Sequence, residues 1–152
     1  MGNRVYVTLE GTEKPKTYYL HWNGGLDTWT SIADVIFEND VLKPERVIEF
    51  LDSLDIKSEL QNGKCHDWLE ENGHYFINLG EKTFRIRKET SQGIVNKLSF
   101  HLEADFIDYL KKHISPSFQE ETYKVYWEEI HNLGKTFFKK EREERNGIKS
   151  KI

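Results

Sequence analysis

Tyr18-Tyr19-Leu20-His21-Trp22-Asn23-Gly24-Gly25-Leu26-Asp27 is the stretch that decides the fold, because it combines a strand, a turn and a helix start in ten residues. Tyr18, Leu20 and Trp22 are expected on one face of the strand and Tyr19 and His21 on the other, since strand side chains alternate. The Asn-Gly-Gly segment ends the strand, because these residues tolerate positive φ. Asp27 or Thr28 is expected to cap the helix.

Patterns on either side extend this unit. Val5, Val7 and Leu9 alternate with polar residues, and the loop that contains Gly11 and Pro15 predicts an antiparallel hairpin into the Tyr18 strand. A second helix is expected to open at Pro44. The first helix has an apolar stripe at i, i+3, i+4, i+7 and i+8, made of Trp29, Ile32, Ala33, Ile36 and Phe37.

The middle of the chain has a weaker pattern. Residues 61–63 are expected to form a turn and residues 66–71 a single helical turn. Two strands follow, with Tyr75, Ile77 and Leu79 on one side of the first, and Gly80-Glu81 joins them as a hairpin. Residues 94–100 fit either a strand or a helix, and the pattern leaves both open.

The last third is expected to be helical. One helix ends before Pro116, and Ser117 with Glu120 matches a capping box for the next. Gly134 lies inside that last helix, where glycine costs about 1 kcal/mol relative to alanine. A long aromatic stripe, more typical of core than of a cofactor site, is formed by Tyr123, Tyr126, Trp127, Ile130, Leu133, Phe137 and Phe138.

These elements predict an α+β fold. We expect an antiparallel sheet of four to six strands, with helices packed mainly on one face and a long C-terminal amphipathic helix. Residues 1–140 would form a single domain, and residues 141–152 a charged, frayed tail. The exposed remainder of the C-terminal helix is a candidate homodimer interface.

Composition restricts the classes of function. The 152 residues carry a net charge of −4, and residues 135–152 contain seven Lys or Arg against three Glu, so the body is acidic and the tail basic. Direct nucleic-acid binding is therefore not expected, whereas an acidic body can occupy a basic groove on another protein. No membrane segment or signal peptide is predicted, and the single Cys65 fits the reducing cytoplasm.

The turn is the first candidate site. Amides at a helix N-terminus attract anions, so His21, Asn23, Gly24, Gly25 and Asp27 are the candidate ligand-binding residues. The pattern is neither of the nucleotide fingerprints GxGxxG and GxxxxGK[ST]. A strand-to-helix connection with ordinary capping explains the same residues. His21 beside Asp27 suits a general base, but no nucleophile accompanies them, and no catalytic residue is assigned.

Two further groups of residues are candidates for a basic face and for a zinc site. Lys82, Arg85, Arg87 and Lys88 form a candidate basic face for phosphates or an acidic partner, although Phe84 points away from it and a solvated strand face is the alternative. Cys65-His66-Asp67 with His74 lacks the pair-like spacing of a structural zinc site. The sequence therefore predicts no metal and no cofactor.

The Met1-Gly2-Asn3-Arg4 start and the His21-Trp22-Asn23-Gly24 turn support one resemblance. Residues 1–35 resemble a group of small proteins of bacteriophages and mobile elements that open with Met-Gly-x-Arg and have a His-Trp-Asn/Asp-Gly turn. The resemblance implies a setting among the accessory genes of phages and plasmids, where many small acidic proteins inhibit a host enzyme or defence complex. Together with the acidic body, the small size and the lack of a catalytic signature, it predicts a small protein-binding inhibitor or modulator, such as an anti-CRISPR protein. The alternative is a small-ligand or nucleotide-phosphate binding protein, or an enzyme, that uses the glycine turn after His21.

Overall fold

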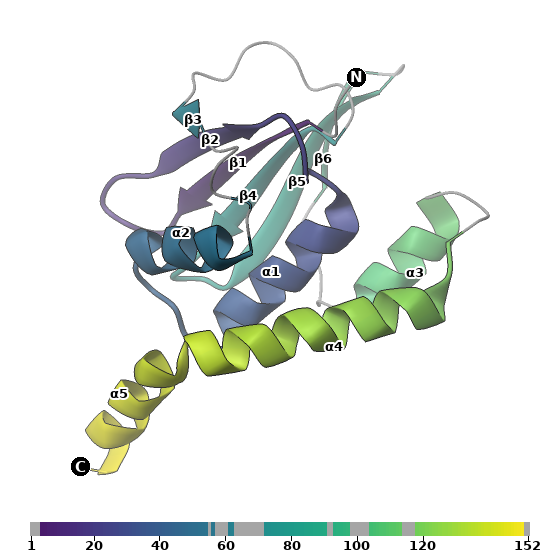
Figure 1. Ribbon diagram of the computed structural model, residues 1–152. Helices are drawn as coiled ribbons and strands as arrows, with labels where there is room; N and C mark the ends of the chain where they lie inside the picture. The colour runs from purple at the N-terminus through teal and green to yellow at the C-terminus, as the bar shows by residue number, and fades with distance from the viewer. Residues whose placement is uncertain are drawn as a thin grey trace.

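A computed structural model of the chain describes residues 4–54, 56, 61–62, 72–90, 93–97, 104–113 and 118–150. These residues form an α+β fold with a six-stranded sheet in the order β3-β2-β1-β4-β5-β6 (Figure 1). The strands are β1 Val5–Glu10, β2 Lys16–Leu20, β3 Gln61–Asn62, β4 His74–Asn78, β5 Thr83–Thr90 and β6 Gly93–Lys97. The helices are α1 Leu26–Glu38, α2 Pro44–Ser53, α3 Ala104–His113, α4 Glu120–Phe137 and α5 Lys139–Ser150.

The sheet is mixed, which differs from the expected antiparallel arrangement. The β1–β2 and β4–β5 hairpins are antiparallel as expected, and the β2–β3 and β5–β6 pairs are antiparallel too. However, β1 and β4 run parallel, with Tyr6 opposite His74. Parallel neighbours need a long crossover connection. The chain between β1 and β4 contains both α1 and α2, which supplies that length.

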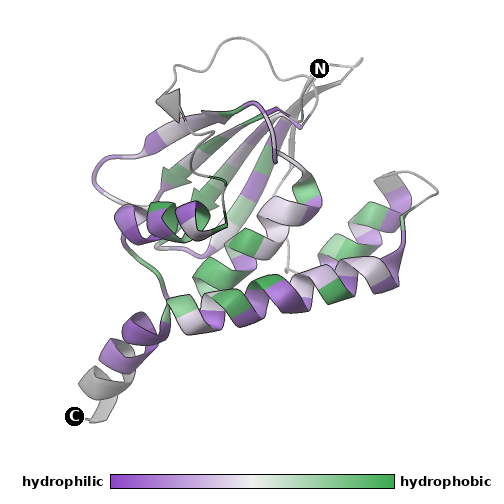
Figure 2. Ribbon diagram, in the orientation of Figure 1, coloured by the Kyte–Doolittle hydropathy of each residue, from purple (hydrophilic) through white to green (hydrophobic). Residues whose placement is uncertain are grey.

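One face of the sheet packs against α1 and α2. Val5, Val7 and Leu9 of β1 are buried there together with Trp29 and Ile36 of α1. The predicted stripe of α1 is confirmed, because all five of its residues are buried. Figure 2 shows that hydrophobic residues gather on the strands and on α1, whereas α5 is hydrophilic.

Several local predictions need correction. Strand β2 ends at Leu20, so Trp22 lies in a bend, and its side chain is 50% exposed. Gln61 and Asn62 pair with Tyr19 and Tyr18 as a short strand rather than a turn. Residues 93–97 form a strand, which decides between the two alternatives for that part of the chain. The helical turn expected at residues 66–71 lies outside the described residues.

Helices α3 and α4 form a second layer. Helix α1 lies between the sheet and α4 (Figure 1). A separate small core, which contains Phe106 and Leu110 of α3 and Tyr123 and Trp127 of α4, joins α3 to α4. The N-cap of α4 is Gln119, which has no side-chain cap, and Glu120 pairs with Lys111 and Lys124. Ser117, the N-cap that the sequence predicted, lies outside the described residues. None of the helices in the described ranges is long and apolar enough to span a bilayer.

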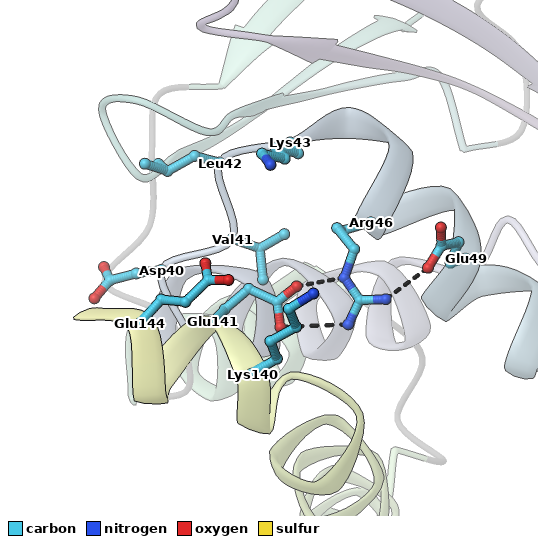
Figure 3. Close-up of a pocket in the computed structure, with 9 residues that line it drawn as sticks. All are labelled: Asp40, Val41, Leu42, Lys43, Arg46, Glu49, Lys140, Glu141 and Glu144. Carbon is cyan, nitrogen blue, oxygen red and sulfur yellow. Dashed lines mark hydrogen bonds and ion pairs between the residues drawn. The ribbon is translucent and has the colours of Figure 1, made fainter. Parts of the chain in front are cut away.

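The start of the predicted tail docks on α2. Helix α4 ends at Phe137, and α5 continues with a first turn whose Glu141 binds Arg46 of α2 (Figure 3). The Arg46 guanidinium also donates to the Phe137 carbonyl at 3.1 Å and lies 4.6 Å from the Phe137 ring centre. Arg142 donates to Asn39 at 2.6 Å. The beginning of residues 141–152 is therefore part of the folded domain rather than a frayed end.

Candidate functional site

The glycine turn is tied to the core through its carbonyl groups. Asn23 adopts a positive φ of 57°, whereas Gly25 has a φ of −60° and is the N-cap of α1. The Trp29 indole N–H donates to the Asn23 carbonyl at 2.7 Å, and the Tyr75 hydroxyl donates to the Gly24 carbonyl at 2.8 Å. The turn that follows β2 is thus held to α1 by a partly buried hydrogen bond and to β4 by a buried one.

The start of α1 already contains a carboxylate. Asp27 accepts from the Thr28 amide at 2.9 Å, and neither Asp27 nor Thr28 is the N-cap that the sequence predicted. A negative side chain in this first turn interacts favourably with the helix dipole and would repel an added anion. These contacts favour the turn as a strand-to-helix connection.

One contact of this turn can be tested directly. Tyr75→Phe removes the hydroxyl that the buried Gly24 carbonyl accepts from, and leaves that carbonyl unsatisfied. We expect a loss of about 1–2 kcal/mol in the free energy of unfolding, measured by urea denaturation. Tyr18→Phe, which changes a half-buried tyrosine of β2, is the matched control and should change stability by less than half as much. Equal losses would contradict the assignment.

His21 contacts the aromatic side chains beside it in sequence. The His21 Nδ1 atom lies 3.2 Å from the Tyr19 hydroxyl, and the His21 and Trp22 rings meet edge to face at 5.0 Å. Both side chains are exposed. His21 therefore belongs to an aromatic surface rather than to an anion site at the helix start.

That surface continues over the face of the sheet opposite to α1 and α2. The register places Tyr19, Tyr6, His74 and Arg87 in one row across β2, β1, β4 and β5. The next row contains Thr17, Thr8, Phe76 and Arg85. We call these eight residues the outer face.

Ring contacts connect the outer face from end to end. Ring centres are 6.5 Å apart between His21 and Tyr19, 5.5 Å between Tyr19 and Tyr6, and 5.9 Å between Tyr6 and His74. His74 then stacks on Phe76 at 4.1 Å, and the Arg85 guanidinium lies 4.9 Å from the Phe76 ring centre. We call this series the aromatic ladder, made of Trp22, His21, Tyr19, Tyr6, His74, Phe76 and Arg85.

A hydrogen-bond chain fixes the middle of the ladder. Thr8 Oγ1 lies 2.6 Å from His74 Nε2 and 2.7 Å from Thr17 Oγ1. Burial, together with the nearby charge of Arg87, lowers the pKa of His74 to about 4. His74 is therefore neutral at physiological pH and is a buried, uncharged part of the outer face.

The residues of the predicted basic face do not all lie on one surface. Arg85 and Arg87 point to the outer face, and Arg85 forms an ion pair with Glu10 of β1. Lys82 lies in the turn between β4 and β5 and forms an ion pair with Asp40 at the end of α1. The side chain of Lys88 lies outside the described residues. Two of the four predicted basic residues thus share one surface with aromatic rings.

Sequence reasoning missed this combination. The aromatic residue of the strand that contains Arg85 and Arg87 is Phe84, which is buried on the other face. The neighbouring rings come from β1, β2 and β4, and their positions depend on the strand order. The alternation of Tyr6 with Val5 and Val7 was the local signal that an aromatic residue lies on the second face.

Comparisons of the chain with protein-family models, with curated proteins and with solved structures found no match. Function is therefore inferred from the geometry of the described residues. Residues 65–67, which the sequence offered as possible zinc ligands, lie outside the residues that the structure describes.

Proposed function

We propose that this chain is a small protein-binding module that modulates a partner protein through the aromatic ladder. The observation that carries the proposal is the half-exposed Trp22, held by the His21 ring at one end of a continuous series of ring contacts. Tryptophan, tyrosine and arginine are the residues most often found at binding hot spots. The ladder contains all three, and the sheet holds its Tyr6, His74 and Phe76 members in place.

Burial favours a protein over a single-stranded nucleic acid as the partner. Base stacking needs exposed rings along the whole path of the strand. Tyr6 and His74, in the middle of the ladder, are only 2% and 6% exposed, so the accessible groups are Trp22 and His21 at one end and the arginine residues at the other. The net charge of −4 also opposes attraction to phosphates.

The two accessible ends indicate the chemistry of the partner. Trp22 would insert into an apolar pocket of the partner. Arg85 and Arg87 would form ion pairs with carboxylates of the partner that lie beyond that pocket. The resemblance of residues 1–35 to phage and mobile-element proteins supports a counter-defence setting. Host nucleases and defence complexes, including CRISPR effectors, are therefore the first partners to test.

The test is co-elution on size-exclusion chromatography with purified host nucleases and defence complexes. Trp22→Ala is expected to weaken a complex at least about 30-fold, the effect of losing about 2 kcal/mol at a hot spot. Val125→Ala is the matched control, because Val125 is a 66% exposed apolar residue on α4. Absence of any stable complex, or equal loss in both variants, would refute the proposal.

The alternative function, binding of a small anionic ligand at the glycine turn, is less well supported by the contacts of that turn. The Asp27 carboxylate lies where the ligand would carry its charge. A homodimer through α4 remains a separate proposal. Its surface would include the half-exposed Leu133 of α4, because Trp127 is buried against α3.

A further inference from the structure

A second group of polar side chains lies between α1 and α4, remote in sequence from the aromatic ladder. Asp34 and Glu38 are one turn apart on α1, and His131 faces them from α4. His131 Nε2 lies 2.6 Å from Asp34 Oδ2 and 3.8 Å from Glu38 Oε2. One ligand atom from each residue lies within 4.8 Å of the other two.

The His131 ring is held in the orientation that a metal ligand needs. Its Nδ1 atom lies 2.7 Å from the Trp127 carbonyl, and a carbonyl can only accept, so Nδ1 donates. The same ring stacks on Trp127 at 4.4 Å. Histidine ligands in metal sites usually donate their second nitrogen to a carbonyl or carboxylate in this way. Nε2 is thereby directed at the two carboxylates.

The close crossing of the two helices sets the distance between these ligands. A Cβ atom on Gly134 would lie 2.1 Å from Val35 Cγ1, so α4 approaches α1 more closely than a larger residue allows. Val35 follows Asp34 directly, and Gly134 is one turn beyond His131. The ligands are therefore presented from rigid helices that the core holds together.

We propose that Asp34, Glu38 and His131 form a binding site for a divalent transition-metal cation of the zinc class. One imidazole with two carboxylates is a ligand set that zinc accepts, and three protein ligands leave a position for water. In a tetrahedral zinc site with bonds of about 2.0–2.1 Å, ligand atoms lie about 3.3 Å apart. The observed distances of 2.6 and 3.8 Å lie on either side of that value.

Small movements of exposed side chains would complete the site. The Glu38 side chain is 63% exposed and Asp34 is 29% exposed, so both carboxylates have room to move by about half an ångström. A shallow hollow lined by Lys124, Trp127, Glu128, His131 and Asn132 gives His131 access to solvent. On binding, the cation replaces the proton that Nε2 shares with Asp34, and that proton leaves to solvent.

The experiment is titration of the metal-free full chain with Zn²⁺, followed by calorimetry and by thermal unfolding. We expect one equivalent to bind and, at Zn²⁺ about 100-fold above its dissociation constant, a rise in melting temperature of about 5 °C or more. Asp34→Asn and His131→Gln should each weaken binding at least about tenfold. Circular dichroism checks that each variant is folded.

Two matched controls make the result specific. Glu128→Gln removes a carboxylate one helical turn from His131, and His21→Gln removes an exposed imidazole, and both should bind Zn²⁺ like the wild type. Mg²⁺, which prefers oxygen ligands, should give no shift. No Zn²⁺ binding by the wild type, or equal binding by folded Asp34→Asn and His131→Gln, would overturn the proposal and leave an ion pair between the two helices.

Discussion

Gly134→Val is expected to lower the free energy of unfolding by about 3 kcal/mol, because the added side chain would overlap the buried Val35. Intrinsic helix preference predicts the opposite sign, since glycine is the poorer helix former. Urea denaturation of the wild type and the variant decides between these two effects.

A double-mutant cycle locates the cause. Val35→Ala together with Gly134→Val moves the branched side chain from α1 to α4 and keeps the volume of the contact. The loss in the pair should be smaller than the sum of the two single losses, by a coupling energy of about 2 kcal/mol. Additive losses would show that Gly134 acts through something other than its contact with Val35.

His74 is expected to make the fold sensitive to acid. Its pKa is lowered to about 4 by burial and by Arg87, whereas an unfolded chain has a histidine pKa of about 6.5. Below pH 6.5 the unfolded chain takes up a proton that the folded chain does not bind. Stability is therefore full above pH 6.5 and falls toward pH 4, by at most about 3 kcal/mol.

Urea denaturation between pH 7.5 and 4.5 measures this effect. The difference in stability between the wild type and His74→Gln should shrink as the pH falls, because the variant lacks the titrating ring. His21→Gln, which changes an exposed histidine, should keep the acid sensitivity of the wild type. A constant difference between the wild type and His74→Gln across this range would contradict the role of the buried ring.

Local patterns predicted the parts of the fold that depend on neighbouring residues. The alternation of Val5, Val7 and Leu9 predicted β1, and the spacing from Trp29 to Phe37 predicted the buried side of α1. Such patterns indicate which face of a strand or helix is buried. Each element buries its apolar face, whichever element packs against it. The α+β class followed from them.

Features that depend on distant residues could not be read in this way. The parallel pairing of β1 with β4 joins residues almost 70 positions apart, and the aromatic ladder exists only because of that pairing. The Asp34–His131 contact spans 97 positions. The caps were also missed, because Gly25 and Gln119 occupy the cap positions without the side-chain hydrogen bonds that Asp27 and Ser117 suggested.

The ladder also changes the interpretation of the turn at residues 18–27. The sequence predicts His21 and Asp27 as parts of one candidate anion site. In the fold, His21 contacts Tyr19 and Trp22. Trp29 and Tyr75 donate hydrogen bonds to two carbonyl groups of the glycine turn, those of Asn23 and Gly24. The same ten residues therefore both connect β2 to α1 and present Trp22 at the surface.

Site-specific photocrosslinking tests the proposed binding surface most directly. The photoreactive aromatic amino acid benzoylphenylalanine is placed at position 22, or at position 125 as the control, and the full chain is irradiated in cells that naturally carry it. The ladder predicts discrete adducts with a partner protein from position 22 and none of these adducts from position 125. The absence of adducts from position 22, or the same adducts from both positions, would contradict binding through Trp22.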